Sequence, residues 1–373
     1  MSGLESQELG KLLKKVRENL KMTQEEIAEK LNVGRDAIIR IEKGTRKIKA
    51  EELNKLTKIY NINMDDLLNN KVNIIEMGDL KMKGIILAGG SGTRLYPITE
   101  GTSKQLVSIY DKPMIYYPLS VLMQAGIKDI LIITTKEDQE NFKRLLKDGH
   151  QFGVNLSYVI QPSPDGLAQA FILGKEFVGN DCCAMVLGDN IFYGNGLEEA
   201  LRQAVANAYN NYATIFGYQV KDPQRFGIME LDEQNNVLSV EEKPQQPKSD
   251  YAITGLYFYP KGVPDMAENV RPSARGELEI TTLNDMYLQE QRLKACIMGE
   301  GYTWFDTGTF DSLLDASNMI RSIEANKDRL VCSPEVIGYN NGWISDEELE
   351  ARAELMKKNS YGQQLAKVLR RTR

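Results

Sequence analysis

The stretch GIILAGGSGTRL, residues 84–95, joins a short apolar run to a glycine-rich loop and decides the class of fold. Consecutive β-branched and apolar residues are typical of a strand that is buried on both faces of a parallel sheet. Three runs of the same kind follow, at residues 129–134, 156–160 and 183–187. Three segments that we expect to be helical lie between the runs, at about residues 114–125, 138–147 and 165–178. The alternation predicts an α/β fold with a Rossmann-like, mixed and mostly parallel sheet that is sandwiched by helices.

The loop after the first predicted strand has the composition of a phosphate-binding loop. Gly89 and Gly90 allow a positive φ and a close approach of the backbone, so several N–H groups can face phosphate oxygens. A Walker A loop would close with Gly-Lys-Ser/Thr, and a dinucleotide-binding GxGxxG motif fails at Leu95, so neither is present. Arg94 adds a bidentate cation that suits a polyphosphate, and Lys104 of the SKQ segment is a second candidate cation.

Polar residues follow two other predicted strands, at the edge where parallel sheets bind their ligands. Gln161 supplies an amide after one strand, and Gly166 supplies a turn against which a flat base can lie. Asp189 follows another strand, and Asp306 stands in a similar apolar, glycine-bounded setting. Taken singly, either aspartate is more often a turn or cap residue. Mg²⁺ prefers one or two carboxylates together with substrate phosphates, so the pair is a candidate Mg²⁺ site.

Composition excludes several classes of protein. The 373 residues suffice for two or three domains, and 42% hydrophobic with 26% charged residues is ordinary for a globular chain. No apolar run approaches the roughly 18 residues of a membrane helix, and the first residues lack the apolar core of a signal peptide, so we expect a cytoplasmic protein. His150 is the only histidine, which excludes any histidine metal cluster, and the four cysteines have no zinc spacing.

The first seventy residues differ from the rest, because they show helical periodicity and no strand pattern. Thr23 with Glu26 predicts a capping box at the start of a helix, and a short turn leads to a further helix at residues 35–43. Two more helices are expected at about residues 49–60 and 64–69. The motif TQEEIAEKLNVGRDAIIRIEKGTR resembles the Xre/Cro family of helix-turn-helix domains, which implies DNA binding.

By this resemblance the candidate DNA contacts are Gln24, Arg35, Asp36 and Arg40. Charge gives limited support, because residues 1–70 hold 14 Lys and Arg against 12 Asp and Glu, whereas residues 34–49 hold six against two. Such a local excess can neutralise several phosphates. The alternative is a small helical bundle that binds protein or that merely carries solvated charges.

A short segment without helical periodicity separates the helical N-terminal part from the α/β part. The segment NKVNIIEMGDLKM, residues 70–82, breaks the helical period. We therefore predict a helix-turn-helix domain over residues 1–70, a linker over residues 71–81 and an α/β domain over residues 82–373 that includes C-terminal helices.

The α/β part resembles the sugar nucleotidyltransferases, and among them most closely the branch that transfers thymidylyl groups. Ten segments carry the resemblance in order: GGSGTRLYPIT, SKQ, KPMIYYPLS, QPSPDGLAQA, LGDNIFYG, RFGIME, VEEKP, ITGLYFY, RGELEIT and WFDTGT. It implies the nucleotidyltransferase fold and a reaction of dTTP with glucose 1-phosphate that gives dTDP-glucose and pyrophosphate, toward deoxysugars such as dTDP-rhamnose. It also implies Mg²⁺ as cofactor, a homotetramer and feedback by a dTDP-sugar.

The same resemblance assigns roles to individual residues. Arg94 would stabilise the leaving pyrophosphate, Lys104 would hold the triphosphate, and Lys243 would hold the sugar phosphate. Asp189 and Asp306 would bind Mg²⁺. The further implied substrate-binding residues are Leu87, Gly89, Gly90 and Gln105, Gln161 and Gly166 for thymine, Glu242 for sugar hydroxyls, Gly227, Ile253 and Tyr257 for the sugar pocket, and Arg275 beside Lys243.

Two positions depart from the pattern of the relatives. Asn195 stands where a histidine is often found, near the region of a second nucleotide-sugar site, and Phe226 stands where an aromatic hydroxyl is common. A rival hypothesis is a transcription regulator that senses dTTP or dTDP-sugars through this α/β part. Another makes the added domain a module for assembly or partner binding. The retention of Arg94, Lys243 and both aspartates favours the enzyme.

Overall fold

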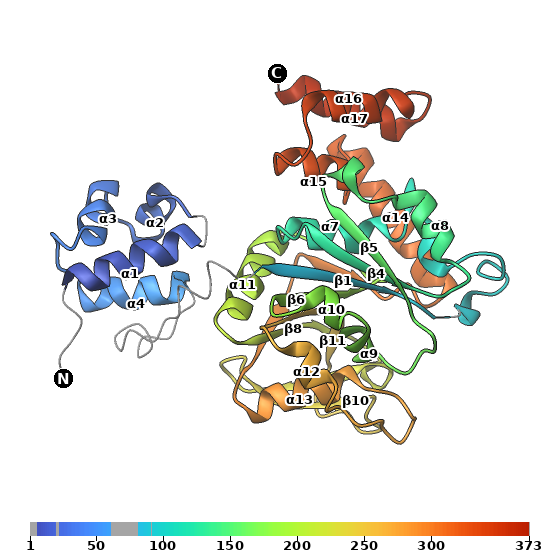
Figure 1. Cartoon of the computed structure of the whole chain (residues 1–373), viewed down its shortest axis with the longest axis horizontal. Coiled ribbons are helices and arrows are strands. Elements are labelled where there is room, and N and C mark those ends of the chain that lie inside the picture. The colour runs from blue at the N-terminus through green and yellow to red at the C-terminus, as the bar shows by residue number, and fades with distance from the viewer. Residues whose placement is uncertain (1–5, 20–21, 61–80, 91, 373) are drawn as a thin grey trace.

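The computed structural model of this protein describes residues 6–19, 22–60, 81–90 and 92–372. At the N-terminus four helices pack around an apolar core of their own (Figure 1). They are α1 (Ser6–Asn19), α2 (Gln24–Leu31), α3 (Arg35–Glu42) and α4 (Ala50–Tyr60). The predicted helix at residues 64–69 and the linker at 71–80 lie outside the described residues, and only Lys81 of the linker is included.

The turn between α2 and α3 has the geometry of a helix-turn-helix. The predicted capping box is confirmed, because the Thr23 hydroxyl accepts from the Glu26 N–H and the Glu26 carboxylate accepts from the Thr23 N–H. Asn32 ends α2 in the left-handed conformation, with φ 55°, and turns the chain toward α3. Both helices bury their apolar faces against α1 and α4.

The α/β part is built on a mixed sheet, as predicted, and this sheet has nine strands in the described residues. Its main path runs β10-β9-β11-β6-β1-β4-β5, and β8 pairs with β11 and β12. The parallel core consists of β1 (Met82–Ala88), β4 (Asp129–Thr134), β5 (Asn155–Ile160) and β6 (Cys182–Leu187). The other strands are β8 (Ala213–Gln219), β9 (Gly227–Leu231), β10 (Val237–Glu242), β11 (Tyr251–Tyr259) and β12 (Leu293–Met298). Two small sheets pair β2 (Ser108–Ile109) with β3 (Lys112–Pro113) and β7 (Ile191–Gly194) with β13 (Tyr302–Phe305).

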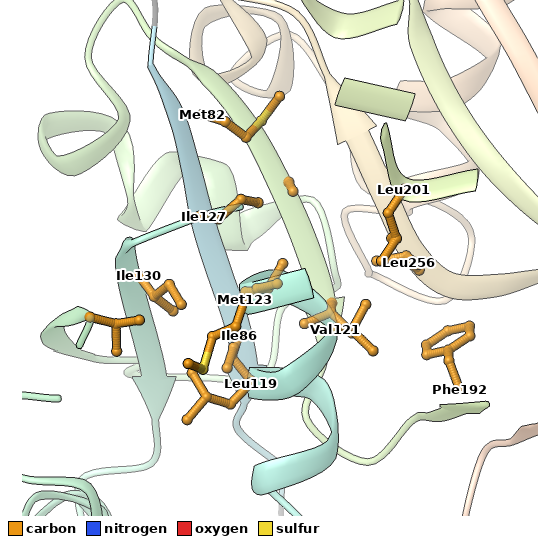
Figure 2. Close-up of a cluster of buried hydrophobic side chains, with 14 of the residues drawn as sticks. Met82, Ile86, Leu119, Val121, Met123, Ile127, Ile130, Phe192, Leu201 and Leu256 are labelled. Atoms are coloured by element: carbon orange, nitrogen blue, oxygen red, sulfur yellow. The ribbon is translucent and has the colours of Figure 1, made fainter. Parts of the chain in front are cut away.

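Helices cover both faces of the sheet, because successive strand residues point to opposite sides. Ile86 belongs to a core shared with α7 (Tyr116–Gln124), α8 (Gln139–Leu146) and α11 (Leu197–Tyr209). Figure 2 shows part of this core, where side chains of β1, β4 and α7 point toward one another. Ile85 belongs to the opposite core, with α9 (Gln169–Leu173), α10 (Lys175–Val178), α12 (Val263–Ala267) and α13 (Ile280–Gln289).

One predicted helix is partly wrong. The segment 165–178 was expected to be continuous, but α9 begins only at Gln169 and Gly174 separates it from α10. The residues before α9 are held by a distant loop, since the Leu278 N–H donates to the Asp165 carbonyl and the Ala168 N–H donates to the Leu278 carbonyl. Gly166 has φ +115° there, and a Cβ would lie 2.4 Å from the Leu278 oxygen, so only glycine fits.

The C-terminal helices extend beyond the sheet (Figure 1). They are α14 (Phe310–Lys327), α15 (Pro334–Asn340), α16 (Asp346–Leu355) and α17 (Ser360–Thr372). A buried carboxylate joins three of them, because Glu335 of α15 accepts hydrogen bonds from Arg352 of α16 and from Tyr361 of α17. No helix in the described part of the chain is both long and apolar enough to cross a membrane.

Candidate active site

A cavity of about 510 Å³ lies beyond the carboxyl ends of β1 and β6, where ligands of such sheets bind. It is lined by most of the residues that the sequence analysis singled out: Gly89, Gly90, Arg94, Lys104, Gln105, Asp189, Gly227, Glu242, Lys243, Ile253, Tyr257 and Asp306. These residues come from segments more than two hundred positions apart. The fold therefore brings the predicted anion-binding cations and the two aspartates to one place.

Four predicted residues lie elsewhere. Leu87 is 7% exposed and belongs to the core beneath the cavity. Gln161 and Gly166 follow β5 and are not among the lining residues, although the Gln161 amide lies against Gly89, which is. Arg275 lines an adjoining cavity of about 520 Å³ together with Arg94, Lys243 and other residues. The two cavities share these cations, so Arg275 extends the cationic side of the site.

The glycine loop carries Arg94 at the mouth of the cavity. Gly90 has φ +106° and Gly92 has φ +59°, values that let the backbone turn sharply after β1. The Thr99 hydroxyl donates to the Gly92 carbonyl at 2.7 Å and closes the loop. Arg94 follows on the short 3₁₀ helix Thr93–Leu95, with its side chain exposed, and no ion pair to it is found among the described residues. It is therefore available to an incoming anion.

Asp189 is held by two neighbours. Its Oδ2 accepts from Lys104 Nζ at 2.7 Å, and its Oδ1 accepts from Asn190 Nδ2 at 2.9 Å. Asn190 cannot reverse, because its own Oδ1 accepts from the Gly255 N–H at 3.1 Å and from Trp304 Nε1 at 2.6 Å. With its oxygen occupied in this way, the Asn190 side chain turns its N–H₂ group toward Asp189.

Pairing of β7 with β13 brings Asp306 beside Asp189. Phe305 lies opposite Ile191 in this antiparallel pair, so the residue after β13 comes next to the residues before β7. The Thr307 hydroxyl reinforces the junction by donating to the Asp189 carbonyl at 2.6 Å. The Asp306 carboxylate is paired as well, because Arg225 Nη2 lies 3.3 Å from its Oδ2.

The two aspartates fit a hard divalent cation. Both residues line the cavity, and carboxylate oxygens are ligands that Mg²⁺ prefers. Within the described residues there is no cluster of three or more His, Cys, Asp or Glu side chains that would hold a metal without help. A cation here would complete its coordination with substrate phosphate oxygens and water, which is the usual arrangement for Mg²⁺.

Where the two cavities adjoin, the carboxylate of Glu242 meets the cations Lys243 and Arg275. The Thr281 hydroxyl donates to Glu242 Oε2 at 2.5 Å and fixes that carboxylate. Lys243 Nζ lies 3.6 Å and Arg275 Nη2 3.5 Å from Glu242 Oε1. Arg275 is itself held by the buried Glu279, and the hydrogen bond to Glu279 raises the pKa of Arg275 above its ordinary value. This region offers both a sugar-binding carboxylate and phosphate-binding cations.

Sequence reasoning missed four residues of the site: Asn190, Arg225, Thr281 and Trp304. All four stand inside segments that the resemblance already quoted, so the signal was present, but their types alone named no role. Their roles depend on hydrogen bonds between distant segments, which the sequence does not show.

Three of the four candidate DNA residues lie on α3, and Gln24 is the first residue of α2. Arg35, Asp36 and Arg40 are exposed, Arg35 pairs with Glu25 at 3.5 Å, and Arg40 Nε donates to the Asp36 carbonyl at 3.2 Å. Gln24 is engaged instead with the interior, because its Nε2 donates to Glu42 Oε2 at 2.9 Å.

Glu42 also forms a buried ion pair with Arg17 of α1. The Arg17 guanidinium donates hydrogen bonds to the Glu42 carboxylate, which raise the pKa of Arg17 and join α1 to α3. The pair therefore stabilises the small domain, and Gln24 is a third member of the same network.

Two family models match the chain. Residues 83–323 match the nucleotidyl transferase model, and residues 13–67 match a helix-turn-helix model. Among curated relatives, the glucose-1-phosphate thymidylyltransferase of Neisseria meningitidis is 57% identical over 290 residues, which are 78% of this chain and 100% of the relative. The enzyme of the same name from Mycolicibacterium smegmatis is 51% identical over 290 residues, again 78% and 100% of the two chains.

Solved structures agree with these matches. A structure from Bacillus anthracis that bears the same enzyme name is 42% identical, with a TM-score of 0.59 over 65% of this chain and 96% of that one. A UDP-glucose pyrophosphorylase structure at 23% identity and a TM-score of 0.57 shares the fold. The chain therefore belongs to the nucleotidyl transferase family, within its glucose-1-phosphate thymidylyltransferases, and carries a helix-turn-helix segment ahead of that part.

Proposed function

We propose that this protein transfers a thymidylyl group from dTTP to glucose 1-phosphate and releases pyrophosphate. The observation that carries the proposal is the meeting of Arg94, Lys104 and Lys243 with Asp189 and Asp306 around one cavity. Two polyanions must approach each other in this reaction, and such a set of cations and metal-binding carboxylates neutralises their repulsion. The names of the relatives point to the same pair of substrates.

The chemistry needs positioning more than proton transfer. An oxygen of the sugar phosphate attacks the α-phosphorus in line, a new P–O bond forms, and the bond to pyrophosphate breaks with its electrons going to the leaving group. The attacking group is a phosphate monoester whose second pKa is about 6, so it is already ionised at neutral pH. No general base is required, which agrees with a chain that has a single histidine.

The position of each residue around the cavity indicates which part of the substrates it would bind. Arg94 on the glycine loop neutralises the leaving pyrophosphate, while Lys104 holds the triphosphate close to Asp189. Lys243 and Arg275 hold the sugar phosphate, and Glu242, fixed by Thr281, accepts from sugar hydroxyls. We propose Mg²⁺ as the cation of Asp189 and Asp306; when bound, it withdraws charge from the phosphate oxygens.

A pyrophosphate-release assay tests the proposal. Glucose 1-phosphate is offered with each of dTTP, UTP, CTP and ATP in the presence of Mg²⁺, and the product with dTTP is identified by mass spectrometry. We expect the highest kcat/KM with dTTP. Absence of turnover with every nucleotide would contradict the proposal and would favour the alternative of a regulator that senses dTTP or dTDP-sugars.

A second function, DNA binding, is favoured by exposed cations on α3 and after it. Arg35, Arg40, Lys43, Lys47 and Lys49 are exposed there. Their phosphate contacts would make the affinity fall with salt. Fluorescence anisotropy with a duplex from the gene's own upstream region, titrated with salt, measures the slope of the logarithm of the affinity against the logarithm of the salt concentration. Absent or salt-independent binding would remove this function.

Matched variants sharpen the DNA test. Lys47→Ala should reduce the slope by about one if Lys47 contacts a phosphate. Lys55→Ala, which alters a lysine of α4 paired with Glu51, should leave the slope unchanged. Equal effects of the two substitutions would indicate a general charge effect instead of a defined interface.

Several other features of this protein stay proposals. Separate apolar cores before and after residues 61–80 support the division into residues 1–70, 71–81 and 82–373. A homotetramer is testable by analytical ultracentrifugation, and feedback by a dTDP-sugar is testable by adding dTDP-rhamnose to the assay. The cytoplasmic location is testable by cell fractionation.

A further inference from the structure

The amide of Gln161 is held in one orientation by a chain of hydrogen bonds that ends on a carboxylate. Gln161 Nε2 donates to Gln169 Oε1 at 2.7 Å, and Gln169 Nε2 donates to Asp165 Oδ2 at 2.8 Å. The Ser163 hydroxyl donates to the same Asp165 oxygen at 2.6 Å. Gln169, the first residue of α9, is 7% exposed, so its amide cannot turn to solvent instead.

Two groups that can act only as acceptor or only as donor fix the direction of these hydrogen bonds. A carboxylate without a proton only accepts hydrogen bonds, so Asp165 requires the N–H₂ group of Gln169. A backbone N–H only donates, and the Asp165 N–H lies 3.4 Å from Gln169 Oε1. Both place the oxygen of Gln169 toward Gln161, so Gln161 must donate to that oxygen from its own N–H₂ group. A reversed Gln161 would set two carbonyl oxygens against each other.

The oxygen of Gln161 consequently lies against the glycine loop. A Cβ at Gly89 would lie 2.0 Å from Gln161 Oε1, and Gly89 is part of the cavity lining. Among the described residues, none donates a hydrogen bond to this oxygen. The site therefore presents an acceptor of fixed position beside the glycine loop, on the side where Gln161 was predicted to meet the base.

We propose that Asp165 and Gln169 are positioning residues that set which pyrimidine the site accepts. The inference rests on the proposed nucleotidyl transfer. Thymine carries a hydrogen on ring atom N3, and that N–H can donate to Gln161 Oε1. Cytosine has a lone pair at N3 and would place an acceptor against an acceptor. The network selects a base with an N3–H, and it does not by itself distinguish thymine from uracil, which has the same group.

Replacing the carboxylate at the end of this hydrogen-bond network tests the assignment. Asp165→Asn replaces a pure acceptor by an amide that can present either atom. Only the longer contact from the backbone N–H of residue 165, at 3.4 Å, then still favours the original orientation of Gln169, so Gln161 can reverse more readily. We expect the ratio of kcat/KM for dTTP over dCTP to fall about tenfold, because a mismatched hydrogen bond is no longer enforced. Ser163→Ala keeps the carboxylate and should preserve the ratio. Asp165 is exposed and Ser163 is half-buried, and neither belongs to an apolar core, so both changes should leave the fold intact.

A double variant separates orientation from structural damage. Asp165→Asn with Gln169→Glu places a pure acceptor at position 169, which again requires the N–H₂ group of Gln161 and accepts from the new Asn side chain. The nucleotide ratio should return to within about threefold of wild type. If Asp165 and Gln169 had a merely structural role, Asp165→Asn would lower kcat/KM for dTTP and dCTP together, and the double variant would not restore the ratio.

Two outcomes would overturn the inference: an unchanged ratio in Asp165→Asn, or a ratio that stays low in the double variant. The dissociation constants of dTTP and dCTP, measured by calorimetry on the same proteins, report the selection without turnover. If wild type binds dTTP over dCTP but makes no dTDP-glucose, the proposed function fails while the positioning role still stands or falls on the binding ratio.

Discussion

Arg225 Nη2 lies 3.3 Å from Oδ2 of Asp306, and this contact neutralises one of the two carboxylates that we assign to the metal. Asp189 is neutralised in the same way by Lys104 Nζ at 2.7 Å. In the absence of a nucleotide, a free cation therefore has to compete with two side chains of the protein. When phosphates enter, they attract the same Lys and Arg side chains, so nucleotide and metal should bind with positive coupling.

The first prediction concerns Arg225. Arg225→Gln should raise the affinity of the nucleotide-free protein for Mn²⁺ by about two- to fivefold, since a part-exposed ion pair is worth up to about 1 kcal/mol. Mn²⁺ is a spectroscopic substitute for Mg²⁺, and the free ion is counted by electron paramagnetic resonance. Arg202→Ala serves as control, because Arg202 pairs with Glu199 on the exposed face of α11. Equal affinities in Arg225→Gln and wild type would contradict the competition.

The strands show how far the sequence alone reaches. The apolar runs at 129–134, 156–160 and 183–187 predicted β4, β5 and β6 to within a residue at each end. β4 and β6 are buried on both faces as expected, whereas β5 is the edge strand of the sheet and only Leu156 in it is buried, so two-sided burial was wrong there. The start of α9 was misplaced, since Asp165 and Ala168 bond to Leu278, more than a hundred residues away. Propensity describes local preferences, and a long-range contact overrides them.

The second prediction concerns Arg94. Arg94→Ala should lower kcat by about 10²- to 10³-fold, the usual cost of losing one preorganised charge-stabilising group, and should leave the KM for glucose 1-phosphate within about threefold. Its side chain is exposed at the mouth of the cavity, so the fold should be unaffected. Steady-state pyrophosphate release gives both constants. Unchanged turnover would remove Arg94 from the catalytic set.

The third prediction concerns Asn190, which is 2% exposed. Asn190→Ala leaves the Trp304 indole N–H and the Gly255 N–H without their acceptor. Each buried donor without a partner costs about 1–3 kcal/mol, so the loss of both should lower the free energy of unfolding by about 2–6 kcal/mol. Denaturant unfolding followed by fluorescence measures the loss. Asn195→Ala, at an exposed position five residues on, should change little. A loss of similar size in both variants would show that the Asn190 network is not the cause.

The site was predictable in its charges but not in its connections. Arg94, Lys104, Asp189, Lys243 and Asp306 were named from their types and segments, and they do surround one cavity. The partners that orient them could not be named. Each depends on register between distant strands, as when β13 pairs with β7 and sets Trp304 against Asn190. A sequence gives residue types along the chain, whereas these hydrogen bonds exist only after the sheet has formed.

The last prediction concerns pH and His150. This residue lies on the surface, 82% exposed, at 3.5 Å from Glu348 and outside the cavity lining. If the sugar phosphate arrives already ionised, no side chain has to remove a proton, and activity should fall only as pH drops through the phosphate pKa of about 6. Below that value the protonated phosphate is the weaker nucleophile, and above it the rate should level off. The kcat/KM of His150→Ala, measured from pH 5.5 to 8.5, should superimpose on that of wild type. A separate shift of the curve in the variant would show that His150 takes part and that the reaction needs a base after all.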